Sequence, residues 1–127
     1  MSDMSPDTRL TLAFAAVVEV GTGLVLMVHP ALVVRLLLGA EVSGVGTLLG
    51  RCFGIALLAL GLACWPSPPR GERGSAAFRA MLIYNVLIAL YLAYLGTIGQ
   101  AGGLLLWPGV ALHAVVALVL VWTWSKA

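Results

Sequence analysis

Four polar side chains interrupt the long apolar stretches of this sequence, and they are the residues best placed to do chemistry. They are Glu19, Arg51, Asn85 and His113. Charged and strongly polar groups inside an apolar, membrane-spanning segment are costly, so they pair with one another, line a wet cavity or carry function. A carboxyl group beside a guanidinium or imidazole group can hold a ligand or a proton. The elements that carry these residues decide whether they meet.

The composition places the chain among membrane proteins. Of its 127 residues, 61% are hydrophobic and 9% are charged, whereas a soluble domain carries about a quarter charged residues. The net charge is only +2, and there is no basic run, which argues against nucleic acid as a partner. Cys52 and Cys64 match no metal-ligand spacing. With no nucleophile–base group, acidic pair or phosphate-binding loop, the sequence indicates no metal, no evident cofactor and no carrier of enzyme chemistry.

Four apolar runs are long enough to cross a bilayer. We predict these spans at residues 10–28, 45–65, 76–95 and 104–124. Nothing is left over for a soluble domain, so residues 1–127 are expected to form a single membrane domain. The predicted fold is an all-α, integral membrane four-helix bundle.

A shorter apolar segment follows the first span. Residues 30–38, PALVVRLLL, are too few to cross a bilayer. Pro30 suits the first turn of a helix, and Arg35 can reach the head groups while its apolar neighbours dip inward. We predict a short interfacial helix on the outer side of the membrane. A bent extension of the first span is the alternative.

Basic residues near the ends of the spans predict the orientation, because they concentrate on the cytoplasmic side. With the N-terminus inside, the outer side holds only Arg35, together with Arg51 if its side chain extends outward. The cytoplasmic side then holds Arg9, Arg70, Arg73, Arg79 and Lys126. We therefore predict an integral membrane protein with both termini in the cytoplasm.

Small neighbours favour inward positions for the polar residues. Glu19 has Ala15 and Gly23 one helical turn away on either side, and small residues flank Asn85 and His113 in a similar way. Small residues stacked on a polar one mark the face on which another helix packs closely. Each polar group is therefore expected to face the interior of the bundle.

Two hypotheses explain such an intramembrane polar cluster. In the functional one, Glu19 pairs with Arg51, and His113 and Asn85 complete the lining of a small cavity for a ligand or a proton. In the structural one, the same groups form a polar network that fixes the packing of the helices and does no chemistry. The residue types fit both.

Glycines recur along the second span and predict a helix-packing surface. Gly46, Gly50 and Gly54 repeat every four residues, Gly61 follows two turns further on, and Arg51 lies within this stretch. Such a ridge allows two helix backbones to approach closely. We expect it to contact another helix of this chain, a second copy or a partner protein.

Three tyrosines of the third span are expected near one face of its helix. Tyr84, Tyr91 and Tyr94 are seven and three residues apart. That face could stack against a flat ligand such as a quinone, or pack against a neighbouring helix with each hydroxyl hydrogen-bonded. Both interpretations stay open.

Two family resemblances add expectations. The stretch Val18-Glu19-Val20-Gly21-Thr22 resembles the first helix of small multidrug resistance transporters, which implies a dimer whose membrane glutamate binds protons and cationic drugs. The segment 30–44 and Arg51 depart from that family. Over its whole length the chain is similar to DoxX-like four-span bacterial inner-membrane proteins, in its layout and in the stretches GRCFGIALLALGLACW and YLAYLG. This resemblance implies a location in a bacterial inner membrane. Some of these proteins accompany quinone-linked oxidoreductases, which implies an accessory role, and no functional residue can be transferred.

Three functional hypotheses follow. The leading one is a small non-enzymatic accessory or scaffold subunit that packs within a larger membrane complex or associates with itself. The second is a small transporter or proton-coupled carrier that uses Glu19. The third is a lipid or quinone binder associated with a redox enzyme, which uses the tyrosine face and the region around Arg51. The expected partners are the lipid bilayer and either a membrane protein or a second copy. A Glu19–Arg51 pair without a cavity would favour the first hypothesis, and an apolar cleft open to lipid beside Tyr84 and Tyr91 would favour the third.

Overall fold

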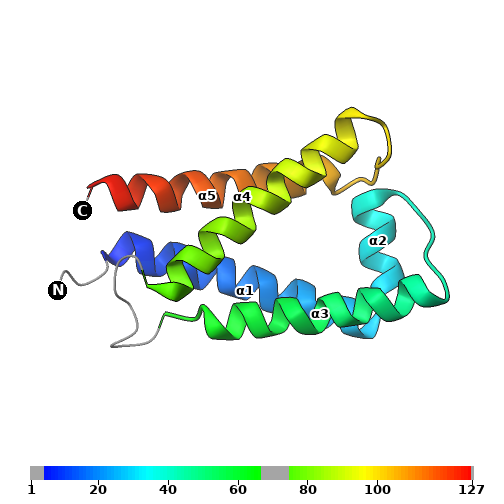
Figure 1. The fold of residues 1–127 in the computed structure, drawn as a ribbon, viewed down its shortest axis with the longest axis horizontal. Coiled ribbons are helices and arrows are strands. Elements are labelled where there is room, and N and C mark those ends of the chain that lie inside the picture. Colours follow the sequence, from blue (N-terminus) through cyan, green and yellow to red (C-terminus); the bar gives the residue numbers. More distant parts are fainter. Residues whose placement is uncertain (1–4, 67–74, 127) are drawn as a thin grey trace.

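The computed structural model describes residues 5–66 and 75–126, and these residues form five α-helices and no strand (Figure 1). The helices are α1 (Pro6–Val28), α2 (Pro30–Leu38), α3 (Val45–Ala63), α4 (Ala76–Thr97) and α5 (Leu106–Lys126). By length and composition α1, α3, α4 and α5 can each cross a membrane. The predicted all-α fold with four helices of spanning length is thus confirmed.

Hydrogen bonds from side chains fix where two of the long helices begin. The hydroxyl of Ser5 accepts a hydrogen bond from the backbone N–H of Thr8 at 3.2 Å, so α1 begins at Pro6, ahead of the predicted start at residue 10. Proline suits this first position because its missing N–H would have no partner there. Ser75 caps α4 in the same way. The prolines and arginines of residues 67–74 lie outside the described residues.

The long helices form two pairs, α1 with α3 and α4 with α5. The pairs are joined at the end where the first and last described residues lie, here called the terminal end. A buried core fills that end, with residues from all four long helices or their ends: Leu12, Ala15, Ala16, Cys64, Phe78, Met81, Val116 and Leu120. Toward the opposite end α4 and α5 diverge from α1 and α3, and α2 runs across the molecule there (Figure 1). That opposite end is called the α2 end.

Glycines bring α1 and α3 into backbone contact. A Cβ added to Gly54 would lie 2.7 Å from the carbonyl oxygen of Gly23, and one added to Gly61 would lie 2.8 Å from that of Ala16. No side chain fits between backbones at this separation. The two contacts also show that the helices are antiparallel, with Gly54 opposite Gly23.

The other two glycines of the ridge also face the chain itself. A Cβ on Gly50 would lie 2.8 Å from Pro30 Cβ, at the junction of α1 and α2. A Cβ on Gly46 would lie 2.5 Å from a methyl group of Val42, in the segment before α3. The predicted packing surface is therefore occupied within this chain, and a partner would have to use another face.

The short helix α2 is separate from α1. The backbone turns at His29, whose side chain accepts a hydrogen bond from the N–H of Leu32 and so caps α2. The bent-extension alternative is therefore wrong. At its other end α2 is tied to the segment before α5, because the N–H groups of Gly102 and Leu105 donate to the carbonyl groups of Leu38 and Leu36.

Candidate functional site

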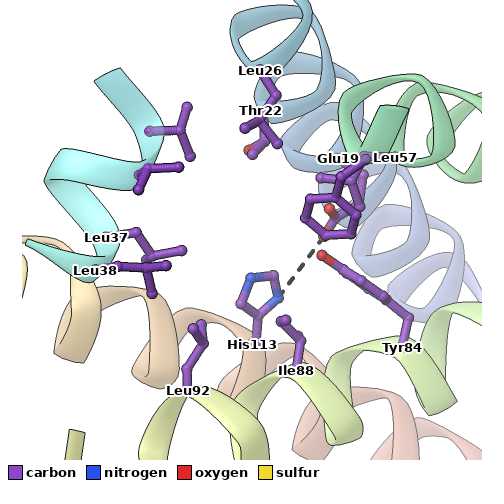
Figure 2. A pocket seen from close by; sticks show the side chains of 13 residues that line it. Glu19, Thr22, Leu26, Leu37, Leu38, Leu57, Tyr84, Ile88, Leu92 and His113 are labelled. Atoms are coloured by element: carbon purple, nitrogen blue, oxygen red, sulfur yellow. Dashed lines mark ion pairs between the residues drawn. The ribbon is translucent and has the colours of Figure 1, made fainter. Parts of the chain in front are cut away.

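A cavity of about 150 Å³ lies where the two helix pairs diverge (Figure 2). All five helices contribute to its lining. Nine of the lining residues are apolar, and the four polar ones are Glu19, Thr22, Tyr84 and His113. This hollow is called the central cavity. A small number of polar groups converging in an apolar hollow is typical of a ligand-binding site.

Glu19 is buried at the edge of this cavity, with only 2% of the residue exposed. Its carboxyl group is hydrogen-bonded by the hydroxyl of Tyr84. The Nδ1 atom of His113 lies 3.9 Å from Glu19 Oε1 (Figure 2), which is too long for a hydrogen bond. The three side chains come from α1, α4 and α5, so the carboxyl group joins the two helix pairs at the level of the cavity.

The hydrogen bonds of Asn85 assign the proton of His113. Asn85 is 1% exposed, and its amide nitrogen Nδ2 donates to the carbonyl oxygen of Met81 at 2.8 Å. The amide oxygen Oδ1 must therefore be the atom that lies 2.8 Å from His113 Nδ1. Since an amide oxygen only accepts, Nδ1 carries the hydrogen. In the neutral ring the lone pair is then on Nε2.

Two polar atoms that face the central cavity have no hydrogen-bond partner in the part of the chain that the structure describes. One is Nε2 of His113, and the other is the side-chain hydroxyl of Thr22, one turn beyond Glu19 on α1. The ring and the hydroxyl approach the same space from α5 and α1 (Figure 2). The two side chains are half-buried, and polar groups withdrawn from water normally have partners, so these two atoms mark the place where a ligand would be held.

A second and larger hollow lies beside the first. It has a volume of about 650 Å³ and runs between α1, α2 and α5. Four residues line both hollows: Thr22, Val33, Leu37 and His113. The rest of its lining is apolar, and some of it, such as Val17 at 58% exposed, lies on the surface of the bundle. This hollow is called the lateral groove. Neither lining contains a lysine or an arginine.

Arg51 is not part of the polar cluster. It is exposed on α3, and no ion pair between it and Glu19 occurs in residues 5–66 and 75–126. Since Gly54 lies opposite Gly23, Arg51 lies at the level of Leu26. Glu19 is therefore about 10 Å away along the helix axis, at about 1.5 Å for each residue from 19 to 26. The expected Glu19–Arg51 pair is replaced by contacts of Glu19 with Tyr84 and His113.

The three tyrosines do not share one binding face. Tyr84 lines the central cavity, whereas Tyr91 is 58% exposed and Tyr94 is 57% exposed. The cause is the divergence of the helix pairs. The helix α4 lies close to α1 and α3 at its start and moves away from them toward its end (Figure 1), so the later tyrosines face no helix of that pair.

Of the four polar residues that the sequence grouped together, the structure brings Glu19, Asn85 and His113 close to one another and leaves Arg51 apart. Thr22, which also lines the cavity, was not predicted. Thr22 is three residues after Glu19 and therefore lies on the same face of the helix, which is the signal that could have found it. No local sequence pattern indicated that Val33 and Leu37 of α2 would line the cavity.

Neither a metal-binding group nor a similar known protein helps to assign this site. Among the described residues, no group of three or more His, Cys, Asp or Glu side chains could hold a metal ion. No protein-family model, curated protein or solved structure matches the chain. The function must therefore be argued from the geometry.

Proposed function

We propose that this is a small integral membrane protein that binds a hydrophobic molecule with a polar head between its helices. This is the lipid or quinone binder among the three hypotheses. The observation that carries it is the pairing of two hollows. The polar atoms of Thr22 and His113 lie where the central cavity adjoins the apolar lateral groove.

The pairing matches the two parts of such a ligand. A polar head would find hydrogen-bonding groups in the central cavity, near the middle of α1. An apolar tail would lie in the lateral groove, whose lining reaches the surface of the bundle. Ligand sites combine apolar linings with a few well-placed polar groups in this way.

The carrier hypothesis has one observation in its favour, the proximity of Glu19 and His113 in the middle of the bundle. A carrier must open its site toward both ends of the bundle. Here the buried core of the terminal end, with Ala16 and Leu120 both 0% exposed, closes that side of the cluster. The closed end favours a binder.

The accessory-subunit hypothesis stays a prediction. A protein that carries a hydrophobic ligand can also belong to a larger complex or pair with a second copy. Such a partner would contact faces other than the glycine ridge, because Gly54 and Gly61 are covered by α1.

We further propose that the helices cross a bacterial inner membrane with both termini in the cytoplasm and α2 at the outer boundary. The distribution of basic residues supports this orientation, because Arg9, Arg79 and Lys126 lie in the first or last turns at the terminal end. The hydrogen bonds between α2 and the segment before α5 hold α2 across the opposite end of the bundle.

Filling the lateral groove tests the binding function. A Cβ added to Gly21, which lines the groove, would meet no atom within 4 Å. The variant Gly21→Phe should therefore fold and occupy the space meant for the ligand tail. The matched control is Val121→Phe, which adds an aromatic ring at a position of α5 that is 51% exposed and lines neither hollow.

Each protein is extracted from membranes in mild detergent and studied by native mass spectrometry and by analysis of solvent-extracted molecules. We expect a bound hydrophobic molecule with the unmodified protein and with Val121→Phe, and a loss of about tenfold or more of that molecule with Gly21→Phe. Equal retention by Gly21→Phe would overturn the proposal. So would the absence of any bound molecule together with no thermal stabilisation by added lipids, phenols or quinones.

A further inference from the structure

The central cavity has room for about one six-membered ring. Its volume is about 150 Å³, the size of a protein cavity that takes up a single benzene molecule. The apolar part of its lining includes the aromatic ring of Phe53. The rings of Tyr84 and His113 meet edge to face, with centroids 5.8 Å apart. A fused sterol nucleus or a phospholipid head group is larger than this space.

The charges around the cavity disfavour an anionic head. Glu19 is the acidic group in the lining, and neither hollow is lined by a lysine or an arginine. His113 gives its Nδ1–H to Asn85 rather than to the cavity. A phosphate or carboxylate placed here would lie beside a carboxyl group without a counter-charge, which is costly away from water. A neutral head avoids that cost.

The unpartnered atoms define the hydrogen bonds that the head must make. Nε2 of His113 can only accept, so the head must donate to it. The Thr22 hydroxyl can donate, so the head can also accept. A hydroxyl group does both at one oxygen atom. A carbonyl or ether oxygen cannot donate, so the bound head would cover Nε2 and leave it without a partner, at a cost in binding.

The ligand tail is restricted to an apolar chain. The lateral groove begins at the residues that it shares with the cavity and continues along α1, α2 and α5 with apolar lining, past Leu36 and Leu112. Its volume of about 650 Å³ is more than four times that of the central cavity at about 150 Å³. An alkyl or isoprenoid chain on the ring would fit this shape.

We infer that the site binds an alkyl- or isoprenyl-substituted phenol or hydroquinone. Its ring lies in the central cavity, its hydroxyl donates to His113 Nε2 and accepts from Thr22, and its chain follows the lateral groove. This inference rests on the proposed binding function and narrows it to the reduced, hydroxyl-bearing form of a ring ligand. His113 is then a specificity-determining residue.

A ligand pair that differs only in the hydrogen-bond donor tests the inference on the unmodified protein. A long-chain para-alkylphenol and its methyl ether are titrated against the purified protein in detergent, and binding is followed by tryptophan fluorescence and calorimetry. We expect the phenol to bind about tenfold more tightly. Under anaerobic conditions an alkylhydroquinone should bind more tightly than the matching quinone by a similar factor.

Variants then locate the donor's partner. His113→Phe keeps a ring of similar size and removes Nε2, so the ratio between phenol and ether should fall to about one while the ether binds as before. Thr22→Val should weaken the phenol and the ether by a similar factor, because either oxygen can accept from the hydroxyl, and should leave the ratio between them unchanged. The control is Tyr91→Phe, which removes a hydroxyl from an exposed position of α4 and should change neither affinity. If His113→Phe does not fold, the ligand pairs on the unmodified protein still decide.

Different outcomes test the inferred phenol or hydroquinone ligand and the proposed binding function separately. Equal binding of phenol and ether, or tighter binding of the quinone or of an anionic alkyl sulfate, would overturn the inference and leave a binder of another class. A failure of every ligand to bind, with no molecule retained during purification, would overturn the proposed function as well.

Discussion

A carboxyl group in the middle of an apolar helix needs a hydrogen-bond donor, and Glu19 has one, the Tyr84 hydroxyl, on a helix of the other pair. Tyr84 reaches it from α4 and His113 approaches it from α5. Asn85 holds the imidazole ring by its Nδ1–H and is itself held by the Met81 carbonyl group. The Met81 carbonyl group thus orients Asn85, and Asn85 orients the ring of His113, so that Nε2 faces the cavity.

Removing the tyrosine hydroxyl tests the contact that holds Glu19. Tyr84→Phe leaves the ring in place and deprives the buried carboxyl group of a donor. We expect the free energy of unfolding in detergent to fall by about 0.5–2 kcal/mol, the range for hydrogen bonds between membrane helices. Thermal unfolding followed by tryptophan fluorescence measures the change.

Tyr91→Phe is the matched control, because the same hydroxyl is lost from a residue that is 58% exposed. Its stability should equal that of the unmodified protein. A Tyr84→Phe variant as stable as Tyr91→Phe would mean that Glu19 does not depend on the tyrosine.

Arg51 shows what a sequence pattern leaves undetermined. The residue lies among the glycines of α3, yet at about 100° per residue its side chain points about 60–100° away from the direction of Gly50, Gly54 and Gly61. The glycine face packs against α1, so Arg51 lies on the exposed side. Small neighbours placed Glu19 correctly, because Ala15 and Gly23 are themselves buried. For Arg51 the small neighbours belong to another face.

At the scale of the helices, α1 and α3 contact each other backbone to backbone, and this contact depends on the absence of side chains. Gly54→Leu should lower the free energy of unfolding by about 1–3 kcal/mol or more, since even its Cβ would lie 2.7 Å from a backbone oxygen of α1. Thermal unfolding in detergent, together with protease resistance, measures the loss.

Gly21→Ala is the control within the same pair of helices. Its Cβ would meet nothing within 4 Å, and alanine favours a helix, so stability should stay unchanged or rise by up to about 1 kcal/mol. If Gly54→Leu were as stable as Gly21→Ala, the backbone contact between α1 and α3 would not hold the pair together.

The short helix α2 illustrates the limit of local patterns at this scale. Its range was predictable from the length of the apolar run and from Pro30, because proline favours the first position of a helix. Its contribution to both hollows was not. That role depends on hydrogen bonds from Gly102 and Leu105 to its last carbonyl groups, which join segments more than sixty residues apart in the sequence, residues 38 and 102.

For the whole molecule, composition alone indicated the number of long helices, because a run of about twenty apolar residues has few alternatives to a spanning helix. The divergence of the two pairs was not predictable in this way. It arises because Phe78 and Met81 bury themselves between the pairs at one end, whereas α2 stands between them at the other. The cavity is the consequence, and so is the exposure of Tyr91 and Tyr94.

The orientation of the whole bundle in the membrane can be tested at its two ends. Ser125 and Gln100 are both exposed, the first at the terminal end and the second between α4 and α5. Single cysteines are introduced there in a Cys52→Ser background, with the buried Cys64 retained. Because basic residues favour the cytoplasm, we expect a membrane-impermeant maleimide to label Gln100→Cys in intact spheroplasts and Ser125→Cys only after lysis. The reverse pattern would invert the bundle and place α2 on the cytoplasmic side, and labelling of both positions in intact spheroplasts would contradict an arrangement in which the helices cross the membrane.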